Sequence, residues 1–161
     1  MSKAFTSEET TLEVVVPPRA PLPPGVRNYV TAHGLELLRA ERRALEAERA
    51  ELEKLPDEGR AAALGVWSTR LAELDQRLAS AELVTPTRQG VVRFGSTVTV
   101  ADQAGEQRSF EIVGVDEADP PRNKIAFLSP LAKALLGHEP GDSVSVQTPG
   151  GRQTLEIVGL D

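Results

Sequence analysis

With 161 residues, the chain is long enough for one ordinary domain or two small ones, and no apolar run approaches the ~20 residues that span a bilayer. Without such an apolar run we expect no membrane association. The sequence contains no cysteine, which excludes disulfide bonds, zinc–thiolate sites and thiol catalysis. Its 18 basic and 24 acidic residues give a net charge of −6, so we expect a protein partner and no sequence-specific nucleic-acid binding.

Residues 1–28 are predicted to form a proline-rich flexible tail. Five prolines lie between Pro17 and Pro24, and this density prevents a regular helix or a central β-strand. We therefore expect the segment to be extended and polyproline-like. It is either a leader with no role of its own or a segment whose Val14–Val16 pack or pair when a partner is bound. The first residues also lack the apolar core of a secretory signal, so we expect a cytoplasmic protein.

Residues 29–84 carry the pattern of an antiparallel coiled-coil hairpin. Thr31 is the predicted N-cap of a first helix, in which leucines recur every seven residues, at Leu38, Leu45 and Leu52. The seam residues of the second helix follow alternating steps of three and four: Leu64, Trp67, Leu71, Leu74, Leu78 and Ala81. This spacing is typical of two helices that pack along their length.

Two kinds of residue interrupt the aliphatic seam. Arg42 and Arg49 occupy its alternate positions in the first helix, so we expect their stems to cover the apolar surface of the second helix. Trp67 is either packed within the hairpin or exposed as an anchor for a partner. Its place in the seam spacing favours packing.

The two helices are separated by a short turn. Pro56 would break a continuous helix, and Gly59 permits a sharp reversal. The arms, about residues 31–54 and 60–83, are nearly equal in length, and at ~1.5 Å per residue each is roughly 36 Å long. This arrangement predicts Asp57 and Glu58 at the tip, where in an arbitrary hairpin they would be solvated turn residues.

Residues 85–161 are predicted to form an α+β domain. Apolar and polar side chains alternate with a period of two, which is typical of strands. Five strands are expected, at residues 91–100, 108–115, 124–128, 143–147 and 153–158. The sequence TPGG at residues 148–151 is a turn signal that joins the last two strands in a hairpin.

The same domain contains one predicted helix and one acidic run. Residues 130–136 form the helix, with Ser129 as N-cap, Pro130 at its first position and Gly137 beyond its end. The acidic run, residues 116–119, is interpreted as a solvated turn or part of a partner contact rather than a cation site. The two histidines are isolated and have no predicted metal ligands near them in the sequence.

Several segments in residues 85–161 resemble the C-terminal domain of the GreA and GreB transcription factors. They are residues 94–100 (FGSTVTV), 113–119 (VGVDEAD) and 129–137 (SPLAKALLG), followed by Gly141-Asp142 and by the TPGG turn. Residues 28–31 (NYVT) resemble the entry into the first helix of GreB. The resemblance covers about residues 28–160, and it implies an FKBP-like antiparallel-sheet domain after the hairpin.

The resemblance also implies a function in transcription elongation. Factors of this family bind bacterial RNA polymerase: the C-terminal domain grips the rim of the secondary channel while the hairpin enters it. Carboxylates at the tip, for which this chain offers Asp57 and Glu58, help to hold the second magnesium ion, so that the polymerase cleaves backtracked RNA. The residues expected to contact the partner are Ser129, Pro130, Lys133, Asp116 and Asp119.

We accordingly expect a monomer that is not itself an enzyme, holds no metal stably and has no cofactor of its own. The only metal involved would be magnesium in the polymerase active site. In this sequence, however, the tip lacks the family pattern of an acidic residue, two intervening positions and then Glu-Asn-Ala.

Each arm is also shorter than in typical Gre factors by roughly one heptad, or ~10 Å. A competitor that occupies the channel without promoting cleavage is therefore an alternative. Two other classes are a prolyl isomerase, which only the implied FKBP-like fold suggests, and a coiled-coil adaptor that dimerises through the hairpin.

Overall fold

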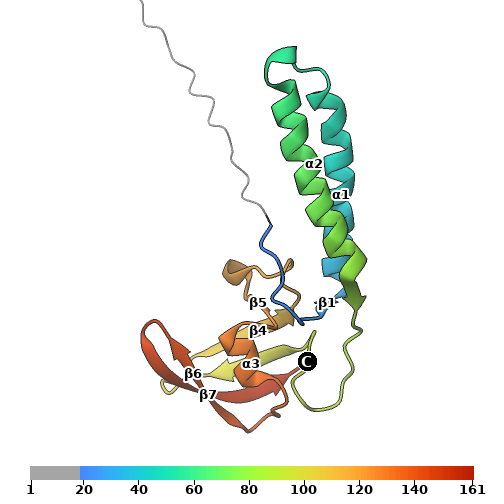
Figure 1. Cartoon of the computed structure of the whole chain (residues 1–161). Helices are drawn as coiled ribbons and strands as arrows, with labels where there is room; N and C mark the ends of the chain where they lie inside the picture. The colour runs from blue at the N-terminus through green and yellow to red at the C-terminus, as the bar shows by residue number, and fades with distance from the viewer. Residues whose placement is uncertain (1–18) are drawn as a thin grey trace, which may run out of the picture.

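A computed structural model defines the architecture of residues 19–161; Val14–Val16 lie outside these described residues (Figure 1). An antiparallel helical hairpin projects from a sheet domain, and its tip lies at the far end from that domain. The elements of the hairpin and its base are β1 (Asn28–Val30), α1 (Ala32–Leu52), α2 (Asp57–Ser80) and β2 (Ala81–Leu83). None of the helices in residues 19–161 is long and apolar enough to cross a membrane.

The hairpin is held together by the predicted seam. Leu38, Leu45 and Leu74 are almost completely buried between α1 and α2, together with Val30 of β1. Thr31 caps α1 as predicted, because its Oγ1 accepts a hydrogen bond from the backbone N–H of Gly34 at 2.9 Å. The partly buried residues around this cluster are Leu35, Trp67, Leu71, Leu78 and Ala81.

The arginines of the seam cover the second helix, as the sequence predicts. Nε of Arg42 lies 2.8 Å from Oδ1 of Asp75 in α2. The guanidinium of Arg49 lies 5.4 Å from the centroid of the Trp67 ring, within the range of a cation–π contact. Trp67 also donates a hydrogen bond from Nε1 to the carbonyl of Leu45 at 2.7 Å, so it belongs to the packing of the hairpin.

The second helix ends earlier than predicted, at Ser80 rather than Leu83. The side chain of Asn28 donates from Nδ2 to the carbonyl of Arg77 at 2.8 Å, and thereby satisfies a carbonyl that the end of a helix leaves free. The chain then leaves the helix as β2, which pairs in parallel with β1. The base of the hairpin is therefore a two-stranded ribbon.

The C-terminal domain is a curled five-strand sheet with a short helix against it, an α+β fold as predicted (Figure 1). Its elements are β3 (Thr97–Ala101), β4 (Gln107–Val113), the 3₁₀ helix η1 (Pro120–Arg122), β5 (Lys124–Ala126), α3 (Pro130–Leu135), β6 (Ser143–Thr148) and β7 (Gly151–Leu160). The order across the sheet is β5-β4-β3-β7-β6. The buried core residues are Val92, Val98, Val100, Phe110, Ile112, Ala132, Leu135, Val144, Val146, Leu155 and Ile157.

Two details of this sheet differ from the sequence prediction. Three of its four strand pairs are antiparallel. β4 and β5 pair in parallel, because the connection between them carries the chain back to the end of the sheet where β4 began, so the sheet is mixed. The first strand begins at Thr97, not at residue 91. Val92 instead pairs with the residues after α3: its N–H donates to the carbonyl of His138 at 2.7 Å, and its carbonyl accepts from Gly137 at 2.8 Å.

The hairpin and the C-terminal domain meet in a packed joint. Tyr29 of β1 contacts Phe94 and Phe127 of the domain, and the three ring centroids are 5.5 to 5.8 Å apart. Backbone approaches backbone at Gly114, where an added Cβ would lie 2.5 Å from the carbonyl oxygen of Tyr29. A larger residue at position 114 would therefore separate the two parts.

Candidate functional site

The hairpin tip presents the two predicted carboxylates. Pro56 precedes α2, and Asp57 and Glu58 follow it, but Glu58 and Gly59 depart from helical geometry. The φ angle of Gly59 is +93°, a conformation that residues with a Cβ rarely adopt, and no other atom lies within 4 Å of the position its Cβ would take. Gly59 thus makes the reversal, and both acidic side chains are exposed at the end of the hairpin.

One of these carboxylates has a partner within the tip. Oδ1 of Asp57 lies 2.5 Å from Nη2 of Arg60, and the Asp57 side chain is 90% exposed. An exposed ion pair contributes at most about 1 kcal/mol, so it can be broken, but the guanidinium competes with a cation for this carboxylate. Among residues 19–161, no group of three or more His, Cys, Asp or Glu side chains is placed to hold a metal ion.

The short helix α3 presents Pro130 and Lys133 on one exposed face. Ser129 begins the helix as predicted, because its Oγ accepts a hydrogen bond from the N–H of Ala132 at 3.2 Å. Ala132 and Leu135 are completely buried on the opposite side. Because residues three apart share a helix face, Pro130 and Lys133 together form a surface that a partner can contact.

Asp119 lies in the loop before η1 with its carboxylate partly exposed. Its backbone is fixed by two hydrogen bonds to Lys124, at 2.9 and 3.1 Å. Its Oδ2 lies 3.5 Å from Nε of Arg122, which is 80% exposed, so this pair is readily exchanged for another cation. Asp119 is therefore available to a partner.

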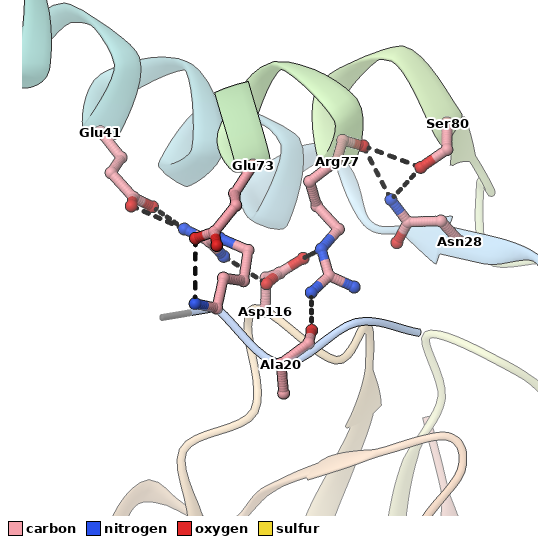
Figure 2. Close-up of polar contacts among 8 residues, drawn as sticks. Ala20, Asn28, Glu41, Glu73, Arg77, Ser80 and Asp116 are labelled. Carbon is pink, nitrogen blue, oxygen red and sulfur yellow. Dashed lines mark hydrogen bonds and ion pairs between the residues drawn. The ribbon is translucent and has the colours of Figure 1, made fainter. Parts of the chain in front are cut away.

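The acidic run also contains Asp116, which the structure places inside the molecule. Its side chain is only 11% exposed and lies between Arg77 of α2 and Arg19 of the N-terminal segment (Figure 2). Oδ2 of Asp116 is 3.3 Å from Nε of Arg77, and Oδ1 accepts a hydrogen bond from Arg19. The expectation that Asp116 contacts a partner is corrected accordingly, because both of its oxygens face cations of the same chain.

Glu117, the next residue, is the second residue of the acidic run that makes contacts inside the molecule. Its side chain is 2% exposed, and Oε2 accepts a hydrogen bond from Oγ1 of Thr31 at 2.6 Å. Nζ of Lys124 lies 3.5 Å from Oε1. Residues 116 and 117 therefore join the C-terminal domain to the hairpin and do not form the solvated turn that was predicted.

Sequence reasoning also missed the N-terminal side of this joint. Arg19 and Ala20 fall in the predicted flexible tail, yet both make hydrogen bonds to α2. The backbone N–H of Arg19 donates to Oε2 of Glu73 at 3.1 Å, and the carbonyl of Ala20 accepts a hydrogen bond from the guanidinium of Arg77. No local pattern marks these residues, because the contacts join segments more than 50 positions apart in the sequence.

A cavity of about 390 Å³ lies between the sheet and Leu131 of α3. The prolyl isomerase alternative would require an aromatic-lined pocket. Among the residues that line the cavity, however, Phe110 is the only aromatic one, and the guanidinium of Arg108 lies 5.3 Å from the centroid of its ring. The remaining lining residues are Val100, Asp102, Glu106, Val146, Thr148, Gln153 and Leu155.

Comparison with known proteins gives a family match for the C-terminal domain. Residues 86–161 match the family described as "Transcription elongation factor, GreA/GreB, C-term". Transcription elongation factor GreA of Paracoccus denitrificans (strain Pd 1222) is 45% identical over 93 residues, which cover 56% of this chain and 60% of that protein. The corresponding GreA of Desulfovibrio desulfuricans (strain ATCC 27774 / DSM 6949 / MB) is 43% identical over 99 residues, or 60% of this chain and 61% of that protein.

The chain therefore spans about three fifths of the length of the curated relatives it matches. Among solved structures, GreA factor homolog 1 (Gfh1) of Thermus thermophilus is 27% identical with a TM-score of 0.42, and the match covers 84% of this chain and 99% of that one. The GreA/GreB factor of Nitrosomonas europaea is also 27% identical with a TM-score of 0.42.

Proposed function

We propose, because residues 86–161 match the C-terminal domain of the GreA/GreB family, that this protein is a transcription elongation factor that binds RNA polymerase. The match of residues 86–161 to that family is the observation that carries the proposal. The partner contact is assigned to the exposed face of α3, formed by Pro130 and Lys133, and to the partly exposed carboxylate of Asp119. Ser129 supports this face by capping the helix.

In this proposal the hairpin enters the secondary channel of the polymerase. The arrangement of the two parts supports this role, because the hairpin points away from the C-terminal domain and ends in an exposed tip (Figure 1). The 21 residues of α1 give an arm of about 32 Å. The packed aromatic joint around Tyr29 gives the arm a firm base on the domain.

We further propose that the protein occupies the channel but stimulates transcript cleavage poorly. Direct ligation of magnesium requires a carboxylate oxygen to approach to about 2.0–2.1 Å, so an arm that ends one helical turn short cannot provide a ligand. The carboxylates expected to act at the tip are Asp57 and Glu58, and Asp57 is paired with Arg60. The guanidinium of Arg60 would have to be displaced before Asp57 could approach a metal in the channel.

The binding step is tested with purified core polymerase and the full chain. We expect the chain to copurify with core polymerase, and we expect the variants Lys133→Ala and Asp119→Ala to bind more weakly. Arg152→Ala changes an exposed charge on β7, which is not part of the assigned surface, and serves as the control. The absence of binding by the parent chain would refute the proposal and would favour the coiled-coil adaptor, which needs no polymerase.

A further inference from the structure

The N-terminal residues next to the joint contact three separate parts of the molecule. Arg19 donates two hydrogen bonds from Nη2 to the carboxylate of Glu41 on α1, both at 2.6 Å. Its Nη1 donates to Asp116 of the C-terminal domain, and its backbone N–H donates to Glu73 on α2. One residue thus connects both helices of the hairpin with the sheet domain.

This arrangement differs from an ordinary surface ion pair. The side chain of Arg19 is 21% exposed, and its partner Asp116 is 11% exposed, whereas the median exposed pair contributes almost nothing to stability. Burial acts to lower the pKa of Arg19, but the hydrogen bond to Glu41 and the charges of Asp116 and Glu41 outweigh it, so the pKa lies above its usual value. Arg19 is therefore a fixed positive charge between carboxylates of the two parts.

A second arginine completes the network from the hairpin side. Arg77 is 6% exposed, and its guanidinium lies beside Asp116 and donates to the carbonyl of Ala20 (Figure 2). Asp116 alone cannot compensate the charges of both arginines, and Glu41, which is paired with Arg19, supplies the second negative charge. Removing Arg19 would leave Glu41 without its hydrogen bonds and would release the N-terminal segment from the domain.

We infer that residues 19–27 form a strap that locks the orientation of the hairpin relative to the C-terminal domain, with Arg19 as its anchor. Without the strap, the joint retains the aromatic contacts of Tyr29, the hydrogen bond between Thr31 and Glu117 and the ion pair between Arg77 and Asp116. The expected effect of losing the anchor is therefore a wider range of hairpin orientations, with both parts still folded. The inference concerns the free protein and does not depend on the proposed binding to polymerase.

The absence of cysteine makes a distance measurement direct, because two introduced cysteines can be labelled selectively. Ser68 on α2 and Ser145 on β6 are exposed, so Ser68→Cys and Ser145→Cys place one spin label on each part of the full chain. Pulsed electron paramagnetic resonance then gives the distribution of distances between the labels. The test variants are Arg19→Ala, which removes the anchor, and Arg19→Glu, which places a negative charge against Asp116 and Glu41.

Arg27→Ala is the matched control. Arg27 belongs to the same segment, but it pairs only loosely with Glu82 at 3.6 Å and is 68% exposed. We expect a narrow distribution for the labelled parent and for Arg27→Ala, a broader one for Arg19→Ala and the broadest for Arg19→Glu. A parent-like distribution in both Arg19 variants, or equal broadening by Arg27→Ala, would overturn the inference. Circular dichroism of each variant checks that its helix and strand content is that of the parent.

Discussion

The hydroxyl of Thr31 and the carboxylate of Glu117 link the start of the hairpin to the C-terminal domain across 2.6 Å. The same hydroxyl accepts the N–H of Gly34, so one oxygen both caps α1 and holds the domain. Because Glu117 is buried, it cannot replace this donor with water. The link therefore makes a specific prediction about residue 31.

We predict that Thr31→Val lowers the free energy of unfolding by about 1–3 kcal/mol, because it removes both the cap and the donor to Glu117. Thr31→Ser keeps the hydroxyl and is the control, with an expected stability close to that of the parent. Urea unfolding followed by circular dichroism measures the difference. Equal stabilities of the two variants would show that the hydroxyl has no such role.

Two glycines in the helices of the hairpin provide a second prediction. Gly65 on α2 has open space around it, so Gly65→Ala should stabilise the protein by up to about 1 kcal/mol through helix propensity alone. At Gly34 an added Cβ would lie 2.7 Å from Oε2 of Glu117, and Glu117 is held by Thr31 and Lys124. We expect Gly34→Ala to destabilise the protein despite the same gain in helix propensity.

Thermal unfolding of the two glycine variants beside the parent makes this comparison. The structure requires opposite signs for the two changes in stability. A gain in stability at both positions would mean that Glu117 moves aside freely, and that the close approach of α1 to the C-terminal domain is unimportant.

The hairpin seam gives a third prediction. Leu74 is completely buried against α1, so Leu74→Ala should cost about 2–5 kcal/mol. Leu37→Ala, at a position that is 46% exposed, should cost much less. Hydrogen exchange should show protection lost over residues 60–80 while the sheet domain stays protected. Protection retained throughout that helix in Leu74→Ala would contradict the packing described for α2.

The hairpin was the more predictable part of the fold. Its seam residues recur with the period of the helix, and each of Leu38, Leu45 and Leu74 is buried as predicted. The end of α2 was not predictable in this way, since it depends on Asn28, which is 49 residues away in the sequence. Local periodicity contains no information about such a cap.

In the candidate site, too, features set by neighbouring residues could be predicted and features set by distant residues could not. Asp57, Glu58 and Pro130 occupy exposed positions that turn and capping signals predict, because these signals act within a few residues. Asp116 looked equally exposed in sequence, but Arg77 and Arg19 approach it from distant segments. Whether a charged residue is exposed to a partner or paired inside the protein depends on such contacts between distant segments.

The proposed partner surface gives a fourth prediction. Pro130→Ala should weaken binding to polymerase several-fold while leaving thermal unfolding nearly unchanged, because proline at the first turn of a helix contributes little beyond preorganisation. Pro140→Ala changes another exposed proline outside α3 and serves as the control. Unchanged affinity of Pro130→Ala for core polymerase would discredit the α3 face as the contact.

The tip gives the fifth prediction, which concerns the chemistry of the channel. The double variant Asp57→Ala/Glu58→Ala should bind polymerase as the parent does, because the proposed contact lies on the C-terminal domain. It should also leave the low rate of transcript cleavage unchanged, since the proposal gives the tip carboxylates no effective part in metal ligation.

Cleavage of RNA in a stalled, backtracked polymerase complex measures whether this chain occupies the channel without promoting cleavage. The complex is incubated with a cleavage-active Gre factor and increasing amounts of this chain, and in parallel with this chain or its tip double variant alone. We expect the chain to suppress cleavage by the Gre factor and to produce little cleavage alone, with or without its tip carboxylates. Robust cleavage by the parent chain that is lost in Asp57→Ala/Glu58→Ala would contradict the account and would make the protein a true cleavage factor.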